Sequence, residues 1–144
     1  MSVGRICMRE VDTAGPNESA LDAARRMRDR QVGTVVVVDD QDRPMGLVTD
    51  RDIVTRAVAH GREAARTPLV DIMTPMPTSV QNTSIESALG HMRVGRLRRL
   101  PVVNGSGALV GIVTLDDILA LLAEEFSLIG GLLERESPHQ MVPR

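Results

Sequence analysis

The sequence predicts an α+β (mixed α/β) fold made of two copies of one unit, each a small mixed sheet with two helices on one face. A phrase that begins at Gly46, Gly-Leu-Val-Thr-Asp-Arg-Asp-Ile, returns at Gly111 as Gly-Ile-Val-Thr-Leu-Asp-Asp-Ile, 65 positions later. The same spacing relates identical residues elsewhere, such as Ala23 and Ala88. Each copy has about 60 residues, which is marginal for a unit that folds alone. The copies are therefore expected to cover each other, packed about a pseudo-two-fold axis.

The first copy contains a short strand, a capped helix, two further strands and a second helix. Asn17 or Ser19 can cap the first helix, whose alanines and Met27 fall on one face. The β-branched run that begins at Thr34 is too short for a spanning helix and predicts a buried strand. The expected elements are a strand at 6–8, a helix to about 30, strands at 34–38 and 45–48, and a helix from 49 to about 60.

The second copy repeats this order after a rigid segment in which Pro75 and Pro77 fix the backbone. The expected elements are a helix at 84–94, strands at 100–103 and 109–113, and a helix from 114. Methionines 8, 27, 73 and 92 recur at the repeat spacing and are interpreted as core residues. The predicted boundaries are 3–61 and 68–126 for the repeats, with a partly helical tail at 127–144 that is frayed at 138–144. Gly130 and Gly131 interrupt the apolar stretch of this tail, which either extends the last helix or contacts a second chain.

Composition excludes several classes of function. All 17 basic residues are arginine, which excludes Schiff-base lysine chemistry and a P-loop lysine. Phe126 is the only aromatic residue, so a platform that stacks nucleic-acid bases cannot be built. The chain has neither a signal-peptide pattern nor an apolar run of about 20 residues, which predicts a cytoplasmic protein without a membrane span. Cys7 is alone, so no intramolecular disulfide forms.

The Thr-x-x-Asp of each copy has two interpretations. Thr49 and Asp52 resemble a capping box at a helix start, and on that basis they satisfy only backbone N–H groups. The same geometry suits a nucleoside phosphate, because a helix N-terminus attracts phosphate and an Asp on the first turn can accept both ribose hydroxyls. Its recurrence as Thr114 and Asp117 suggests a repeated site.

The repeat order, the repeat length and the doubled Gly-h-h-Thr-x-x-Asp ending, where h is an apolar residue, resemble a tandem pair of CBS domains, a Bateman module, over residues 3–126. The resemblance implies a regulatory sensor that binds AMP, ADP, ATP, NAD or S-adenosylmethionine between its repeats and changes conformation or dimer contacts. It implies no catalysis, a homodimer and an unidentified regulated protein.

The resemblance also implies two composite clefts, in which the Asp of one repeat holds the ribose and the other repeat holds the base. A basic pair before the Leu-Pro-Val strand would supply charge for phosphates. Site A comprises Thr49, Arg51, Asp52, Thr74, Ser79 and Val102; site B comprises Thr114, Asp116, Asp117, Arg9, Ala14 and Val37; the phosphate-binding pair is Arg98 and Arg99.

The two sites are expected to be unequal. Arg51 beside the Asp of site A is a fixed cation that suits a phosphate. Site B has Asp116 at that position, and this carboxylate repels a phosphate unless Arg98 compensates. The sequence therefore favours site A for a phosphorylated nucleotide and predicts that site B is weaker, empty or suited to a less charged ligand.

Other functions are less well supported. A structural or protein-interaction module that binds a partner without nucleotide is the main alternative. The arginines at 93, 96, 98 and 99 form a cluster, but the net charge of −2 and the lack of a recognition motif argue against nucleic acid. The three histidines lack ligand spacing, and no nucleophile motif appears, so neither a metal site nor an enzyme is expected.

Overall fold

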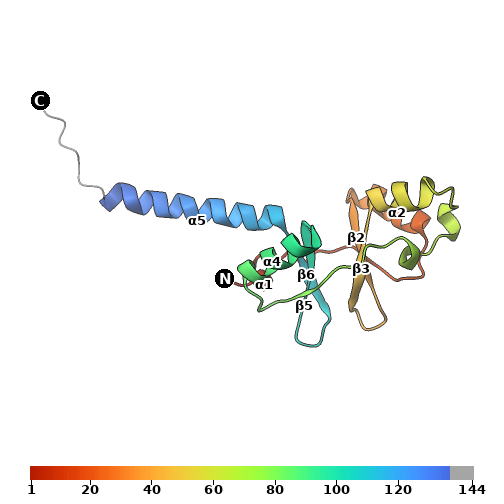
Figure 1. The fold of residues 1–144 in the computed structure, drawn as a ribbon, viewed down its shortest axis with the longest axis horizontal. Helices are drawn as coiled ribbons and strands as arrows, with labels where there is room; N and C mark the ends of the chain where they lie inside the picture. Colours follow the sequence, from red (N-terminus) through yellow and green to blue (C-terminus); the bar gives the residue numbers. More distant parts are fainter. Residues whose placement is uncertain (137–144) are drawn as a thin grey trace, which may run out of the picture.

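The computed structural model describes residues 1–136, apart from the side chains of Ser79 and Glu136. Two three-stranded sheets lie side by side, with strand orders β1-β2-β3 and β4-β5-β6 (Figure 1). In each sheet the first strand runs parallel to the second, and the second runs antiparallel to the third. The predicted fold of two similar α+β halves is confirmed. The segment expected to fray, 138–144, lies outside the described residues.

The two halves repeat the same order of elements. The first half contains β1 (Thr13–Ala14), α2 (Ala20–Arg30), β2 (Thr34–Val38), β3 (Pro44–Thr49), α3 (Asp50–Asp52) and the π-helix η1 (Ile53–Val58). The second half contains β4 (Ser79–Val80), α4 (Ile85–Gly95), β5 (Arg99–Val103), β6 (Leu109–Thr114) and α5 (Leu115–Glu136). Short helices α1 (Val3–Ile6), η2 (Ala64–Arg66) and η3 (Leu69–Asp71) precede or join them.

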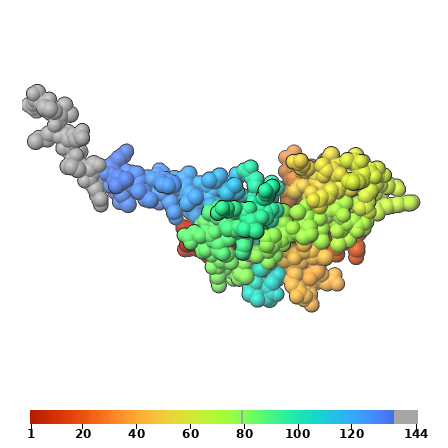
Figure 2. Space-filling model, in the orientation of Figure 1, coloured from red at the N-terminus to blue at the C-terminus, as the bar shows by residue number. Residues whose placement is uncertain are grey.

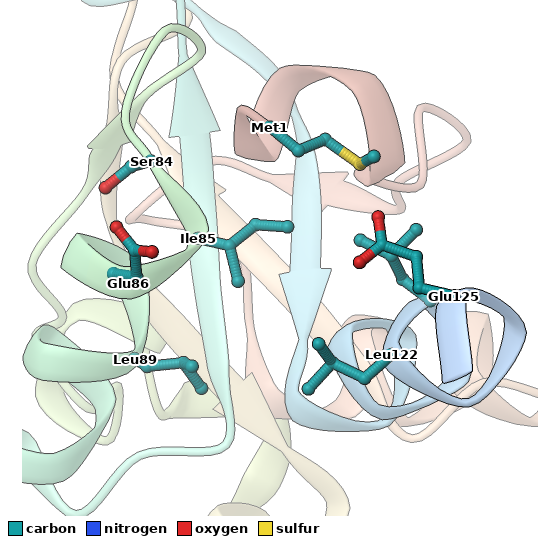
Figure 3. Close-up of a pocket in the computed structure, with 8 residues that line it drawn as sticks. Met1, Ser84, Ile85, Glu86, Leu89, Leu122 and Glu125 are labelled. Atoms are coloured by element: carbon teal, nitrogen blue, oxygen red, sulfur yellow. The ribbon is translucent and has the colours of Figure 1, made fainter. Parts of the chain in front are cut away.

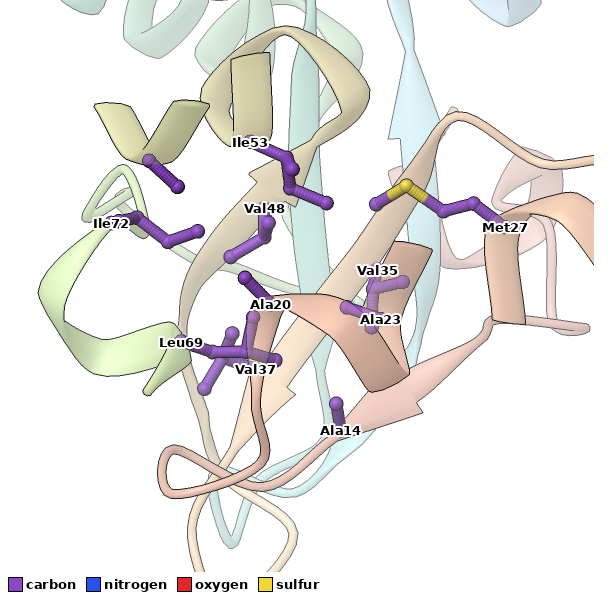
Figure 4. Close-up of a cluster of buried hydrophobic side chains, with 11 residues drawn as sticks. Ala14, Ala20, Ala23, Met27, Val35, Val37, Val48, Ile53, Leu69 and Ile72 are labelled. Carbon is purple, nitrogen blue, oxygen red and sulfur yellow. The ribbon is translucent and has the colours of Figure 1, made fainter. Parts of the chain in front are cut away.

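Each sheet has a helix-facing side and a side that faces the other sheet. In the first half, Met27 of α2 packs against Val35, Val37 and Val48 of the sheet (Figure 4). A second cluster packs α4 and the start of α5 against β5 and β6. The opposite faces meet in a third cluster made of Val36, Leu47 and Ile112. The apolar face that a single sheet would leave exposed is thus covered by its counterpart.

The opening segment of each half packs on the other half. Met8 forms an antiparallel bridge to Ile112 of β6, with N···O distances of 2.8 and 2.9 Å, and α1 lies in the second half's core. Thr74 bridges Leu47 of β3 in the same way, and η3 lies in the first half's core. The strand expected at 6–8 is therefore wrong: these residues form a short helix and one bridge.

The exact 65-residue spacing fails in these opening segments. Thr74 pairs with Leu47 as Met8 pairs with Ile112, although the residue 65 positions before Thr74 is Arg9. The opening segment of the first half is therefore one residue longer than that of the second half. Cys7 approaches Gly111 as Met73 approaches Gly46. Met8 is consequently 53% exposed, and its interpretation as a core residue is wrong, whereas Met27 and Met92 are buried as expected.

The helix starts follow the sequence closely. Ser19 accepts a hydrogen bond from Asp22 N, and Ser84 accepts one from Ser87 N, each at 3.1 Å. At the other end of the chain, α5 continues through Gly130 and Gly131 to Glu136, so the start of the tail extends the last helix, which is one of the two alternatives that the sequence leaves open. α5 projects away from both sheets as a straight arm (Figures 1 and 2).

Candidate functional site

Both Thr-x-x-Asp motifs form capping boxes at the carboxyl end of a sheet's last strand. Thr49 Oγ1 accepts from Asp52 N at 3.1 Å, and an Asp52 carboxylate oxygen accepts from Thr49 N at 2.9 Å. Thr114 and Asp117 make the same two bonds at 3.1 and 3.0 Å. The capping interpretation is therefore correct, and it fixes each Asp on the first turn of its helix.

Asp52 of site A is closely surrounded. It is 9% exposed, and its second carboxylate oxygen lies 3.4 Å from Thr74 Oγ1 and 3.8 Å from Arg56 Nε. Arg56 also donates to the carbonyls of Ile72 and Met73. The structure thus brings Asp52 and Thr74 together as expected. Arg56 of η1 lies between Asp52 and the opening segment of the second half.

A cavity of about 260 Å³ opens between the halves at the Thr114 end of β6, and of the six residues predicted for site B it is Thr114 that lines it. Thr114 and Arg99 stand opposite each other in the β5–β6 register, and both line it. The apolar wall is formed by the inter-sheet residues Val36 and Ile112. The remaining lining residues are Met8, Glu10, Val11, Asp12, Val32, Gly33 and Thr34.

Three residues assigned to the base pocket point elsewhere. Ala14 and Val37 belong to the first half's helix-facing core, with 4% and 0% exposure, and Val102 is fully buried in the second half's core. Their side chains cannot contact a ligand in the cleft. The side chain that faces the cavity is that of Val36, one residue earlier, because successive residues of a strand point to opposite faces.

The remaining predicted residues lie around the two motifs. Arg51 is exposed on α3, and the backbone of Ser79 pairs with Val102 in the β4–β5 register. The exposed Arg9 donates through its guanidinium to the carbonyl of Gly4 at 2.9 Å, while its neighbours on either side line the cavity. Arg98 Nη2 lies 3.4 Å from a carboxylate oxygen of Asp116, and both side chains are exposed.

Sequence reasoning missed the acidic and small residues of the cavity. Glu10 and Asp12 follow Met8, the residue that bridges Ile112, and Asp12 forms an ion pair with Arg30 of α2. Thr34 stands opposite Thr49 in register, as Arg99 stands opposite Thr114. The repeat spacing, which pairs Thr34 with Arg99, was the signal that could have identified Thr34.

Residues 1–136 lack two further features. No group of three or more His, Cys, Asp or Glu side chains there is arranged to hold a metal ion. No helix in that range is both long enough and apolar enough to cross a bilayer.

Comparison with known proteins gives the family. The CBS domain model matches residues 3–59 and again residues 69–124. CBS domain-containing protein YhcV of Bacillus subtilis is 39% identical over 110 residues, 76% of each chain. An uncharacterized protein of Methanopyrus kandleri is 38% identical over 120 residues, which cover 83% of this chain but 61% of that protein.

Solved structures agree in fold. Hypoxic Response Protein I, solved with two coordinated zinc ions, has a TM-score of 0.76 and 32% identity, covering 83% of this chain and 98% of that one. Protein PAE2072 from Pyrobaculum aerophilum, complexed with AMP, has a TM-score of 0.75 and 26% identity, covering 86% and 97%. The domain pair of MJ0100, in complex with 5′-methylthioadenosine and S-adenosyl-L-methionine, has a TM-score of 0.73 and 25% identity, covering 87% and 98%. The chain belongs to the CBS domain family and contains two CBS domains in tandem.

Proposed function

We propose that this chain is a regulatory module that binds an adenosine-type ligand (AMP, ADP, ATP, NAD or a related compound) between its two halves, changes its conformation or dimer contacts, and does so as a homodimer without catalysis. The observation that carries the proposal is the cavity at site B, which joins Thr114 at the N-terminus of a 22-residue helix to Arg99 and an apolar wall. The ligands of the PAE2072 and MJ0100 structures support the adenosine class.

One side of the cavity, with Thr114, Arg99 and the apolar wall, suits a nucleoside phosphate. A volume of about 260 Å³ is near the lower limit of small-molecule pockets, about 300 Å³, and suits one nucleoside with its phosphate at the open mouth. Aliphatic walls at Val36 and Ile112 can sandwich a base. The free N–H groups at the start of α5 and the guanidinium of Arg99 both favour an anion.

The charge distribution modifies the sequence's ranking of the sites. Asp116 was expected to weaken phosphate binding at site B, but Arg98 lies against it. At site A, Asp52 is already engaged by Thr74 and Arg56. We therefore propose that site B binds the ligand first, with Thr114 at the phosphate and Asp117 at the ribose, while Asp52 and Thr74 serve a second, weaker site.

The proposal is tested by titrating the full chain with AMP, ADP, ATP, NAD and S-adenosylmethionine in a calorimeter, with GMP as the base control. At a ligand concentration 100 times its dissociation constant, binding stabilises the native state by about 2.7 kcal/mol, so the melting temperature rises by several degrees. Adenosine ligands should bind and GMP should not. Absence of heat and of any melting shift with every adenosine ligand at millimolar concentration would refute the proposal.

Asp116→Asn is expected to tighten the binding of phosphorylated ligands by about two- to fivefold. The change removes a carboxylate near the cleft and frees Arg98, and the gain is small because both groups are exposed. Adenosine without phosphate should bind the variant and the wild type equally. Asp40→Asn, in an exposed turn, is the matched control, and an equal gain there would show that only the net charge matters.

A second candidate is a protein-interaction module that keeps the fold and binds no nucleotide. The acidic residues Glu10 and Asp12 within the cavity favour it, because they oppose a phosphate. It predicts a partner whose affinity is unchanged by adenosine ligands at saturating concentration.

A further inference from the structure

Arg56 spans site A from one wall to the other. It lies four residues after Asp52, and its Nε is 3.8 Å from Asp52 Oδ1. Its Nη1 donates to the carbonyl oxygens of Ile72 and Met73 at 3.3 and 3.1 Å. Both carbonyls belong to the opening segment of the second half. One side chain therefore joins the acid proposed for a ribose to the segment that faces this acid from the other half.

Both carboxylate oxygens of Asp52 are already engaged. Oδ2 accepts from Thr49 N in the capping box, and Oδ1 faces Arg56 and Thr74 Oγ1. Thr74 is held in place by two backbone hydrogen bonds to Leu47, whereas the side chain of Arg56 is 46% exposed and can move into solvent. Since Asp52 itself is buried, a ribose reaches Oδ1 by displacing the guanidinium.

The equivalent acid of the second half is open. Asp117 Oδ2 accepts from Thr114 N at 3.0 Å, and within residues 1–136 its Oδ1 has neither a hydrogen bond nor an ion pair. Asp117 is also partly exposed, where Asp52 is buried. The residue 65 positions after Arg56 is Leu121, which lines the groove between α4 and α5 (Figure 3). The second half thus has an aliphatic side chain where the first half has a cation.

The backbone that carries Arg56 differs between the halves as well. The π-helix η1 contains this residue, and Ala59 N donates to Val54 O, five residues earlier, at 2.8 Å. The corresponding residues of the second half, 118–123, belong to the α-helix α5. Turns of π-helix are rare and frequently occur at functional sites. The two halves therefore diverge in side chain and in backbone at the residue that contacts Asp52.

We propose that Arg56 is a gate that closes site A to nucleosides. In the closed state its guanidinium takes the place of the ribose hydroxyls at Asp52 Oδ1. A site whose open state is populated for a fraction of the time loses affinity by that fraction, so site A binds weakly as long as Arg56 holds its contacts. The inference rests on the adenosine-type ligand of the proposed function, but it concerns site A and does not require that site B binds.

The test counts adenosine sites per chain by calorimetry of the full chain, from micromolar to millimolar adenosine. Adenosine is the probe because it has no phosphate, whose attraction to Arg56 would oppose the effect. The wild type should bind one adenosine. Arg56→Met should bind two, with site A strengthened at least about tenfold, the effect of one hydrogen bond to a charged group. Adding Asp52→Asn to this variant should remove the second site again.

Arg66→Met is the matched control. It also removes one arginine from the first half, but the Arg66 side chain is 83% exposed and pairs with Glu63, so adenosine binding should not change. Circular dichroism and the melting temperature show whether Arg56→Met is folded. If it is not, Arg56→Lys replaces it: a methylene then faces Asp52 in place of Nε, while the ammonium group remains for the carbonyls of Ile72 and Met73. The second site should appear there as well.

The count of sites separates the gate from the proposed function. One site in the wild type and one in the folded Arg56 variant overturn the gate and leave the proposed function standing. No site in either protein overturns both. No site in the wild type but one in Arg56→Met, dependent on Asp52, supports the gate and refutes binding at site B. Two sites in the wild type show that site A is open, and overturn the gate. Weaker binding of AMP with unchanged binding of adenosine would make Arg56 a phosphate-binding residue instead.

Discussion

Gly111→Ala is expected to lower the free energy of unfolding by about 2–4 kcal/mol, the range of severe core disruptions. A Cβ at this position would lie 2.4 Å from the carbonyl oxygen of Met8 and 2.9 Å from Cys7 Sγ. The backbone cannot yield without breaking the two hydrogen bonds of the Met8–Ile112 bridge. The opening segment of the first half would then detach from β6, and the fully buried Val3 would be exposed. Urea denaturation measures the loss.

Gly90→Ala is the matched control for this experiment. A Cβ there meets no atom within 4 Å, and the residue lies in the interior of α4. The variant should be more stable than the wild type by about 0.5–1 kcal/mol, because alanine favours the helix. Gly46→Ala should resemble Gly111→Ala, since its Cβ would lie 2.6 Å from the carbonyl oxygen of Thr74. If the free energy of unfolding of Gly111→Ala lies within about 0.5 kcal/mol of the wild-type value, the opening segment of the first half does not hold the two halves together as described.

Asp117→Ala is expected to weaken adenosine binding by about 10- to 100-fold. The ribose would lose its charged acceptor, and a net contribution of about 1.5–3 kcal/mol, that of one hydrogen bond to a charged group, corresponds to this loss. Calorimetry of the full chain gives the dissociation constant directly. Ligands that lack the ribose should be affected little, which separates this role from a general loss of fold.

Asp52→Ala provides the comparison that assigns the site. Both variants lose the same capping box, so both should lose about 1 kcal/mol of stability. Asp117 is hydrogen-bonded to Thr114, which lines the cavity, whereas Asp52 belongs to the other motif, so the Asp52 variant should retain the affinity of the tighter site within about threefold. The reverse pattern, with binding lost at Asp52→Ala alone, would place the principal ligand at site A.

The sequence predicted the elements well but not which way their side chains face. Repeat spacing, capping serines and β-branched runs located the strands and helices within a few residues. In the run from Val35 to Val38 every residue is apolar, so no alternation distinguishes the helix-facing side from the cleft-facing side. The family resemblance implied Val37, and nothing in the run shows that its neighbour Val36 is the residue that lines the cleft.

Long-range placement was beyond the sequence for a physical reason. The opening segments that carry Met8 and Thr74 are completed by the edge of a strand more than 25 residues away, and nothing local records which edge that is. The sequence left open whether the tail extends the last helix past Gly130 and Gly131. The helix does continue, because glycine costs a helix only about 1 kcal/mol, which neighbouring leucines can offset.

Because α5 begins directly after Thr114, which lines the cavity, a small tilt at its first turn moves its far end by a larger distance. The halves cannot open like a hinge, because reciprocal bridges at Met8 and Thr74 tie each sheet to the other. A helix of 22 residues is about 33 Å long, so a tilt of about 5° at its root displaces its tip by about 3 Å. A displacement too small to see at the cleft thus becomes, at the far end of the arm, a shift comparable to the rise of two residues.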